Sequence, residues 1–286
     1  TATCGGGDPT PDPEPEPEGT TFNIHEVWPG ERVTASKSGD DFNVNIASYG
    51  GGQWQGQLKL EHNVSFENTK TYKVGFTLTA DKDCDKITFK TDDNQGEVYE
   101  NQTINLTAST PYHYEKVFKG QAGNNKLTVF DFGWVGENTN ITISDLTLVE
   151  FSPATASSFG GEYIPFLAVD GNTGTRWQAA SKGEAWWKMD YGTSQSFNRV
   201  NITWENSYAK SFTIQGSNDD ESYTTLATVS GQTISTFPYK QVIDLDQLYN
   251  YRYVKFVGTE NGNDYGFSFY EFEIMEVETS VLTSVV

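Results

Sequence analysis

Apolar and polar residues alternate in short runs along most of the chain, and Gly, Asn and Asp separate one run from the next. The clearest run is TYKVGFTLTA at 71–80, in which one face of an extended chain carries Tyr72, Val74, Phe76, Leu78 and Ala80. Alternation with a period of two is typical of a half-buried β-strand. Comparable runs in the first half predict strands at 57–60, 86–91, 102–106, 112–118, 126–132 and 141–149.

The second half shows the same pattern after the linker-like sequence FSPATAS at 151–157. It predicts strands at 186–192, 199–205, 211–219, 240–245 and 251–259. Many short strands without a helical period are typical of antiparallel sandwiches. We therefore predict an all-β protein with β-sandwich domains at 21–150 and 151–278, preceded by a segment at 1–20 and followed by a tail at 279–286.

The length and net charge of the chain limit the number of domains and the kinds of binding partner. A chain of 286 residues is long enough for two domains that each bury a core. The net charge of −20 disfavours nucleic acid and anionic membrane surfaces, and it favours a neutral or cationic partner. Aromatic residues make up 14% of the chain, more than two small cores need, so some of them are expected to face outward as contact surface.

The N-terminus begins with small residues, Cys4 and a Gly run, and residues 8–18 alternate Pro with acidic residues. Such a segment cannot form a packed element and predicts an extended tether. This start resembles the lipidated N-terminus of a bacterial surface lipoprotein. The resemblance implies a lipid on Cys4, an outer-membrane location facing the exterior, and membrane contact only through that anchor; otherwise the protein is secreted. The alternative is an expression scar followed by a linker.

Only two cysteines, Cys4 and Cys84, are present. The chain therefore has no disulfide framework, no cysteine zinc cluster and no cysteine nucleophile with a matching base.

Several strings in the first half are shared with a known group of sugar-binding modules. They are Trp54-x-x-Gln57-Leu58, the start of a strand at 70–72, FTLTA at 76–80 and ISDLTL at 143–148. Together they resemble carbohydrate-binding module family 4 and its relatives. The resemblance implies a jelly roll whose concave face binds a β-glucan, and a structural calcium in this first domain with Asp145 as a ligand.

The alternation of 57–60 places Gln55, Gln57 and Lys59 opposite Leu58 and Leu60, so the glutamines are expected on the open face. In KLTVFDFG, Phe130 and Phe132 are then core residues and Asp131 faces the groove. The aromatic candidates for stacking on sugar rings, each with burial in the core as the alternative, are Trp28, Tyr49, Trp54, Tyr99 and Trp134.

Five ordered strings occupy the second half, at 168–177, 186–192, 200–226, 252–261 and 265–275. In that order they resemble the coagulation factor 5/8 C-terminal (discoidin) domain, known among sugar binders as carbohydrate-binding module family 32. With the first half, this implies two tandem jelly-roll β-sandwich domains joined by a short linker.

The loop AVDGNTGTRW at 168–177 concentrates turn residues and oxygen donors. Calcium prefers six or more hard oxygens, which such a turn can supply. By resemblance, a structural calcium in the second domain has as ligands the carbonyls of Leu167, Asn172 and Tyr270, the carboxylates of Asp170 and Glu271, and Thr175. The alternative is an Asx turn without metal.

The sugar site in this family lies in loops at one end of the sandwich. The resemblance therefore implies that the second-domain candidates are Glu162, Tyr163, Arg176, Gln178, Glu205, Tyr208 and Tyr265. Arg176 with the Trp204-Glu205 pair is similar to the glucan- and aminoglucan-binding versions; the galactose-binding versions favour a histidine, and all three histidines of this chain lie in the first half. Trp177 and Trp187 are expected in the core, and a structural ion pair is the alternative role for Arg176.

No paired carboxylates of a glycosidase, no Ser-His-Asp order and no phosphate loop stand out. The sequence thus predicts a protein that is not an enzyme and that binds a polysaccharide, β-glucan first, at a bacterial surface. Expected partners are the polysaccharide, an outer-membrane glycan transporter and surface glycosidases, with no nucleic acid. Alternatives are an ancillary region of a larger glycoside hydrolase and an adhesin for host glycans.

Overall fold

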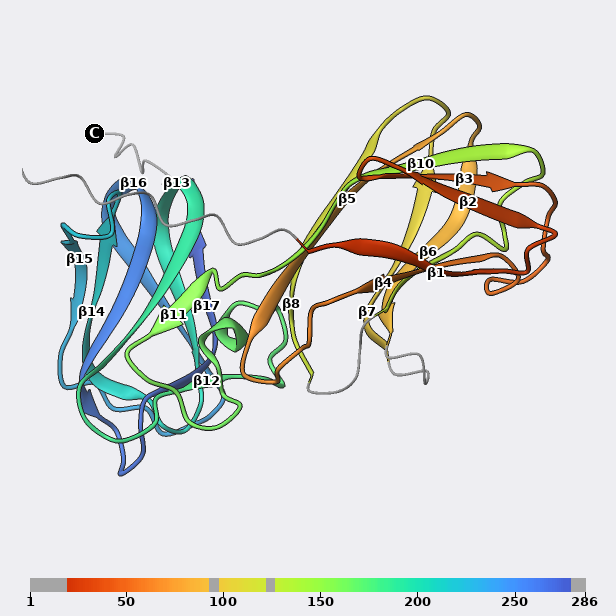
Figure 1. The fold of residues 1–286 in the computed structure, drawn as a ribbon. Coiled ribbons are helices and arrows are strands. Elements are labelled where there is room, and N and C mark those ends of the chain that lie inside the picture. Colours follow the sequence, from red (N-terminus) through yellow and green to blue (C-terminus); the bar gives the residue numbers. More distant parts are fainter. Residues whose placement is uncertain (1–19, 93–97, 122–126, 279–286) are drawn as a thin grey trace, which may run out of the picture.

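The computed structural model describes residues 20–92, 98–121 and 127–278, except for the side chains of 92 and 98–101. The described chain forms two β-sandwich domains and contains no α-helix, which confirms the predicted fold class (Figure 1). Its single helical element is the 3₁₀ turn η1, Pro165–Ala168. Within the described residues, no helix is long and apolar enough to cross a membrane.

The N-terminal domain packs two five-stranded antiparallel sheets face to face. One sheet has the order β1-β4-β9-β6-β7, with bounds Phe22–Trp28, Gln57–His62, Leu127–Asp131, Cys84–Asp92 and Val98–Leu106. The other has the order β2-β3-β10-β5-β8, with bounds Val33–Ser38, Asp41–Ile46, Thr139–Glu150, Thr71–Ala80 and Tyr112–Lys119. Sequence-distant strands are neighbours in both sheets, as is typical of jelly rolls.

The apolar residues of the alternating strands pack against one another between these two sheets. The five apolar residues predicted for one face of β5 are at most 3% exposed. Phe130 and Phe132 on the facing sheet are 0% and 1% exposed, so their predicted place in the core is confirmed. The strands β1, β2 and β3 were not predicted. Only Phe22 of β1 is fully buried, and a register shift between Ile24 and Glu26 interrupts the alternation.

The C-terminal domain is built on one continuous sheet with the order β12-β17-β13-β16-β14-β15, to which β11 adds beside β13. The bounds in chain order are β11 Ala154–Ala156, β12 Trp177–Gln178, β13 Ala185–Trp204, β14 Ala209–Ser217, β15 Thr224–Val229, β16 Tyr239–Asn261 and β17 Ser268–Met275.

The two long strands correct the sequence analysis, which expected separate strands at 186–192 and 199–205 and at 240–245 and 251–259. Register shifts interrupt the β13–β16 ladder at Asp190/Gln195 and Phe197/Arg199. Such bulges bend a strand without ending it. The first part of β13 pairs with β11 and its last part with β17, whereas β16 pairs with β14 through its C-terminal half.

Aromatic rings fill the C-terminal core. Trp177, Trp187 and Trp204 are each 0% exposed and contact the rings of Phe256, Phe269 and their neighbours. The predicted burial of Trp177 and Trp187 is confirmed. Both indole N–H groups donate to backbone carbonyls, as buried tryptophan requires.

Contacts at the domain junction hold the linker to the start of β5. The backbone N–H of Phe151 donates to the Thr71 carbonyl at 3.0 Å, and the Thr71 hydroxyl donates to the Phe151 carbonyl at 2.5 Å. The Lys73 ammonium lies 4.9 Å from the centre of the Phe151 ring. A polar clasp on the other side joins Asn68 and Lys119 of the first domain to Glu162 of the second.

Candidate functional site

Two tryptophans form an exposed pair at one end of the N-terminal sandwich. Trp28 ends β1, and Trp54 lies in the loop between β3 and β4. Their ring centroids are 6.2 Å apart with an interplanar angle of 17°, and the residues are 41% and 60% exposed. The structure thus brings together two of the predicted stacking residues on the surface.

A second aromatic pair lies beside the same loop. Tyr49 is 54% exposed, and its ring centroid is 6.2 Å from that of the half-buried Trp134. The Lys86 ammonium lies 5.4 Å from the centre of the Trp134 ring, a cation–π distance. Lys86 was missed from the sequence because its left-handed backbone (φ 57°) and its approach to Trp134 depend on tertiary structure.

Glycine residues hold the loop between β3 and β4 in place. The amides of Gly50 and Gly51 donate to the Gly133 carbonyl, and the Gly133 amide donates to Gln53. A Cβ at Gly133 would lie 1.8 Å from the carbonyl oxygen of Gly52, so only glycine fits. The aromatic residues of 49–54 are therefore held against the Gly133–Trp134 segment.

Asp131 lies on the sheet face predicted for it, but its side chain is 0% exposed, so the expectation that it faces an open groove is wrong. Gln57 and Gln53 donate to its two carboxylate oxygens at 2.7 and 3.1 Å, and the Lys90 ammonium is 3.6 Å away. Asp131 thus orients the glutamine amides that cover it. Half-buried Gln55 accepts from Arg32 at 3.3 Å.

Two candidates lie outside the described residues. Cys4 falls in the segment before residue 20, and the Tyr99 side chain falls in the undescribed part of β7. Their predicted roles stay predictions.

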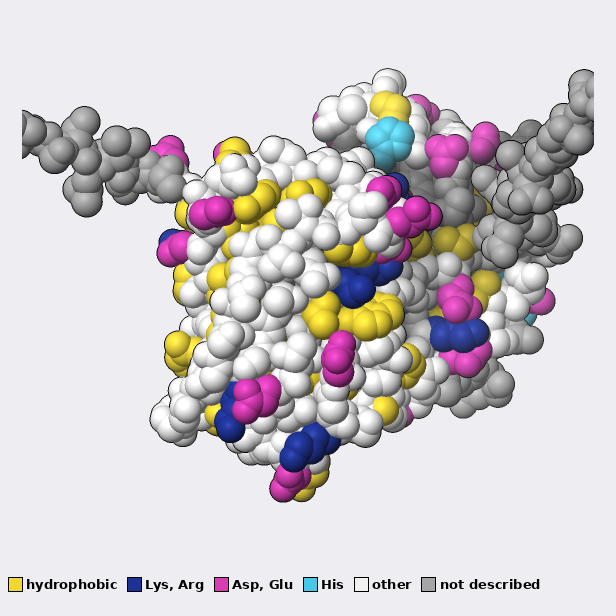
Figure 2. Space-filling model, turned by 90° about the vertical axis from the view of Figure 1, so that its left-hand side faces the viewer, with side chains coloured by type: hydrophobic (Ala, Val, Ile, Leu, Met, Phe, Trp, Pro, Cys, Tyr) yellow, Lys and Arg dark blue, Asp and Glu magenta, His cyan; other side chains and the backbone are white. Residues whose placement is uncertain are grey.

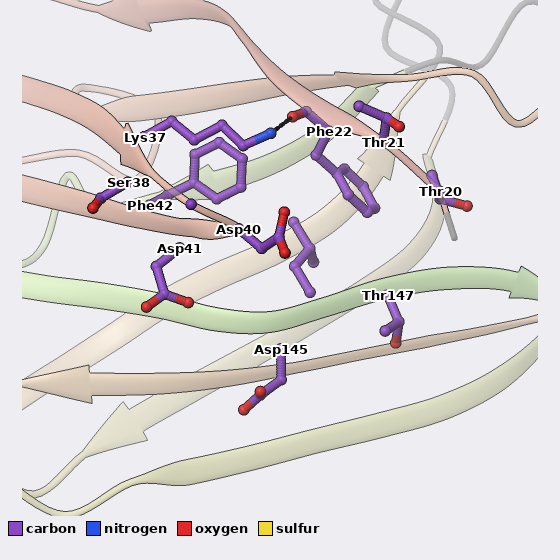
Figure 3. Close-up of a pocket in the computed structure, with 12 residues that line it drawn as sticks. Thr20, Thr21, Phe22, Lys37, Ser38, Asp40, Asp41, Phe42, Asp145 and Thr147 are labelled. Carbon is purple, nitrogen blue, oxygen red and sulfur yellow. Dashed lines mark hydrogen bonds between the residues drawn. The ribbon is translucent and has the colours of Figure 1, made fainter. Parts of the chain in front are cut away.

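Asp145, the candidate calcium ligand of the first domain, lies in β10. It adopts a left-handed conformation (φ 52°) at a register shift in β10, and its Oδ2 accepts from the Thr77 hydroxyl at 2.9 Å. Figure 3 shows it at the edge of a surface depression that Asp40 and Asp41 also line. Among the described residues, no group of three or more His, Cys, Asp or Glu side chains is arranged to hold a metal.

Strand β12 positions the central candidates of the C-terminal domain. The Arg176 guanidinium carbon lies 4.1 Å from the centre of the Tyr163 ring, and Nη2 donates to Gln178 at 3.3 Å. Tyr163 is 40% exposed. Arg176 Nε is buried and has no hydrogen-bond partner in the described chain. No carboxylate pairs with this guanidinium among the described residues, which argues against a purely structural ion pair.

The start of β17 brings two further candidates to the same end. Gln178 pairs with Ser268 on one side, and the Glu205 amide donates to the Ser268 carbonyl at 3.3 Å on the other. The Glu205 carboxylate is half-buried and accepts from the Ser207 amide at 2.9 Å. Tyr265, 65% exposed, projects from the loop that precedes β17.

Two second-domain candidates do not belong to this open surface. Tyr208 is 6% exposed and packs against Phe237 and over Gly262, where a Cβ would lie 2.4 Å from its ring. Its ring is therefore a core element and not a stacking surface. Glu162 is exposed, but its carboxylate faces Asn68 and Lys119 of the first domain.

The loop at 170–175 folds as a tight turn. Asp170 Oδ1 accepts from the Asn172 amide at 2.9 Å, and the Thr175 hydroxyl lies 2.7 Å from Asp170 Oδ2 and 2.8 Å from the Asn172 carbonyl. Gly171 has φ 74°, which suits glycine at this turn. The loop therefore has the local hydrogen bonds of an Asx turn.

Glu271 of β17 lies next to this turn with an orphaned oxygen. It is 8% exposed, and its Oε1 has no hydrogen-bond partner in the described chain. Burial, and then the charge of Asp170, raise the pKa of Glu271 to about 7. Two adjacent carboxylates with a buried unpartnered oxygen fit a hard cation, and the carbonyls of Leu167, Asn172 and Tyr270 would complete the donor set.

Comparisons with known proteins assign the C-terminal half. Residues 153–272 match the family model of the F5/8 type C domain. No curated protein sequence matches the chain significantly. Chitosan-binding module 1 from a chitosanase/glucanase of Paenibacillus sp. IK-5 is 36% identical, with 43% of this chain and 92% of that chain covered and a TM-score of 0.39.

Module 2 of the same enzyme, solved with chitotriose, is 31% identical, with 42% and 93% covered and a TM-score of 0.39. The carbohydrate-binding module family 32 domain of AlyQ, in complex with 4,5-unsaturated mannuronic acid, is 27% identical, with 43% and 94% covered and a TM-score of 0.37. These similarities lie in the C-terminal half, and the N-terminal β-sandwich has no assigned family. Residues 153–272 are thus an F5/8 type C domain.

Proposed function

We propose that this protein binds a polysaccharide without catalysing its cleavage, and that a β-glucan, β-1,3 or mixed-linkage, is the first candidate ligand. The observation that carries the proposal is the exposed, nearly parallel Trp28–Trp54 pair. Aromatic faces stack on the apolar faces of pyranose rings, and the two stacked indoles leave exposed ring surface for such a contact.

Polar side chains beside the aromatic pair support this ligand class. Gln53 and Gln57 are fixed by Asp131, so their amides are oriented before a ligand arrives. Preorganised hydrogen-bonding groups lose little freedom on binding. Sugar hydroxyls both donate and accept, which matches amide side chains better than it matches unpaired charges.

The C-terminal domain offers a second, smaller site. Tyr163 and Tyr265 supply exposed rings, and Arg176, Gln178 and Glu205 supply donors and an acceptor at the same end of the sandwich. Glu205 and the net charge of −20 also suit a cationic aminoglucan. Relatives of this domain named as chitosan-binding make chitosan the second candidate.

The remaining parts of the proposal concern location and metal. The Cys4 segment and the acidic tether support a lipid-anchored protein on the outer face of a bacterial outer membrane, which passes glycan to a transporter and to surface glycosidases. A calcium ion held by Asp170, Glu271, Thr175 and neighbouring carbonyls would tie the first loop of the C-terminal domain to its last strand.

Affinity electrophoresis of the full chain tests the function. Gels contain laminarin, mixed-linkage glucan, xylan, a soluble cellulose derivative or chitosan, and a glycan array covers host structures. Retardation by a β-glucan is expected. Retardation by chitosan alone would transfer the proposal to aminoglucans. Binding to a host glycan with no retardation in any gel would instead identify an adhesin and overturn the proposal.

A further inference from the structure

The outer face of the C-terminal sheet carries an aromatic and basic patch that the proposed sugar site does not use. On β13 the core residue Trp187 is 0% exposed, so its neighbours Trp186 and Lys188 point to the opposite, outer side. On β16, Tyr253 and Lys255 alternate in the same way with the buried Phe256. Figure 2 shows Lys and Arg side chains beside hydrophobic ones on one face of this domain.

Two lysines stand directly opposite each other in this patch. Lys188 and Lys255 are register partners in the β13–β16 ladder. Like charges at directly opposed positions destabilise a sheet, so the arrangement needs a compensating anion. Asp220 supplies one, because its carboxylate pairs with the Lys188 ammonium at 2.5 Å.

Lys255 has no such counter-ion. It forms no ion pair with any carboxylate of the described chain, and its ammonium lies 5.0 Å from the Trp186 ring and 4.8 Å from the Tyr223 ring. The other nearby carboxylate, Asp190, is taken by Arg252 in two hydrogen bonds of 2.8 and 2.9 Å. Of the three cations Lys188, Arg252 and Lys255, Lys255 is therefore the one without an ion pair among the described residues.

The turn that covers the patch is preorganised. Asp220 adopts φ 63°, an uncommon conformation for a residue with a side chain, and its amide donates to the Ser217 hydroxyl oxygen at 3.0 Å. Asp219 accepts from the amides of Glu221 and Ser222 at 3.0 and 2.8 Å. Tyr223 donates its hydroxyl proton to Asp220. The ring beside Lys255 is thus fixed without a ligand.

We propose that this face is a second glycan site, which binds the carboxylate of a uronic-acid residue in an acidic polysaccharide. Lys255 is its counter-ion, and the pyranose lies beside the half-buried rings of Trp186 and Tyr253, whose centres are also 5.9 and 5.6 Å from the Lys188 ammonium. A single unpaired ammonium between aromatic rings matches one carboxylate on a sugar. Nucleic acid would require a broad basic surface, which the net charge of −20 opposes.

Isothermal titration of the full chain with oligogalacturonate and with oligomannuronate tests this site, in 150 mM salt so that the long-range repulsion of the acidic chain is screened. Lys255→Gln is expected to weaken binding of at least one of them tenfold or more, and Trp186→Ala to weaken it as well. Lys240→Gln, which removes the same charge from an exposed lysine paired with Glu273, is expected to leave binding unchanged.

Glu205→Gln separates this site from the loop site, and it is expected to leave uronate binding intact. No binding of either oligouronate by the wild type, or equal binding by Lys255→Gln, would overturn the inference. Loss of uronate binding in Glu205→Gln would do the same, since the ligand would then occupy the loops. Thermal melts confirm that each variant is folded, and laminarin binding, measured separately, reports on the proposed function alone.

Discussion

Tryptophan residues occupy opposite environments in the two domains. Trp177, Trp187 and Trp204 are fully buried, whereas Trp28 and Trp54 stand 41% and 60% exposed beside each other. Burial of apolar surface stabilises a protein by about 25 cal/mol per Å². Two indoles kept in water forgo that stabilisation, so their placement indicates a contact surface and not a packing role.

Removal of one ring of the pair tests this assignment. Trp54→Ala is expected to weaken β-glucan binding about tenfold, or roughly 1.4 kcal/mol, because the sugar loses one stacking surface. The melting temperature should change little, since the side chain is 60% exposed and backbone contacts to Gly133 hold the loop. Titration calorimetry and thermal melts measure the two effects.

Tyr239→Ala is the matched control, because Tyr239 is 42% exposed and belongs to β16 of the other domain. Equal affinities of Trp54→Ala and wild type for every polysaccharide bound would remove the pair from the site.

Individual residues were predictable where a strand's alternation decided their environment. Phe130 and Phe132 were placed in the core for this reason, and both are buried. Tyr208 was misplaced because its burial depends on Gly262, whose missing side chain makes room for the ring. Asp131 was assigned the right face, but its covering by Gln53 and Gln57 comes from a loop that alternation does not describe.

At the scale of elements, the sequence predicted most strands but not their continuity. Polar turn-like stretches at 193–198 and 246–250 suggested breaks, yet they lie within β13 and β16, where the ladder has register shifts. At a bulge, the hydrogen-bonded ladder continues although the hydrophobic alternation is interrupted. The alternation alone therefore cannot distinguish a bend within a strand from the end of that strand. The loop at 170–175 was recognisable because Asp, Asn and Gly form turns through local bonds.

The calcium site proposed between that loop and β17 gives a testable prediction. Saturating calcium is expected to raise the unfolding midpoint of the C-terminal domain, and a chelator to lower it. At a free concentration 100 times Kd the stabilisation is about 2.7 kcal/mol, equivalent to several degrees. Tryptophan fluorescence reports on this domain through its three buried core tryptophans, whereas Trp28, Trp54 and Trp134 of the other domain are exposed or half-buried and change environment less on unfolding.

Asp170→Asn together with Glu271→Gln removes both carboxylates, and the variant should melt at one temperature with calcium or chelator. Magnesium serves as the control ion, because it demands a smaller octahedral site. If the wild type has the same unfolding midpoint in calcium and in chelator, the turn does not bind calcium.

At the scale of the whole molecule, the two candidate sites are linked through the domain junction. Glu162 precedes Tyr163 of the second site, and its carboxylate and carbonyl contact Asn68 and Lys119 of the first domain. The sequence predicted two domains and a short linker, but it placed Glu162 at the sugar. Contacts between domains bring together residues 43 to 94 positions apart, which local patterns do not reveal.

Loosening of this clasp provides a test of cooperation between the sites. Two sites held at a fixed spacing raise the affinity for a chain that reaches both, because the second contact becomes intramolecular. The double variant Asn68→Ala, Lys119→Ala is expected to lower affinity for a long β-glucan three- to tenfold and to leave affinity for a trisaccharide unchanged. Exposed ion pairs contribute little to stability, so both domains should still melt as in the wild type.

Lys182→Ala is the control, because it breaks a comparable exposed pair with Asp264 inside the C-terminal domain, and it should change neither affinity. If long and short ligands lose affinity equally in the double variant, the clasp shapes a single site; if neither changes, the two domains bind independently.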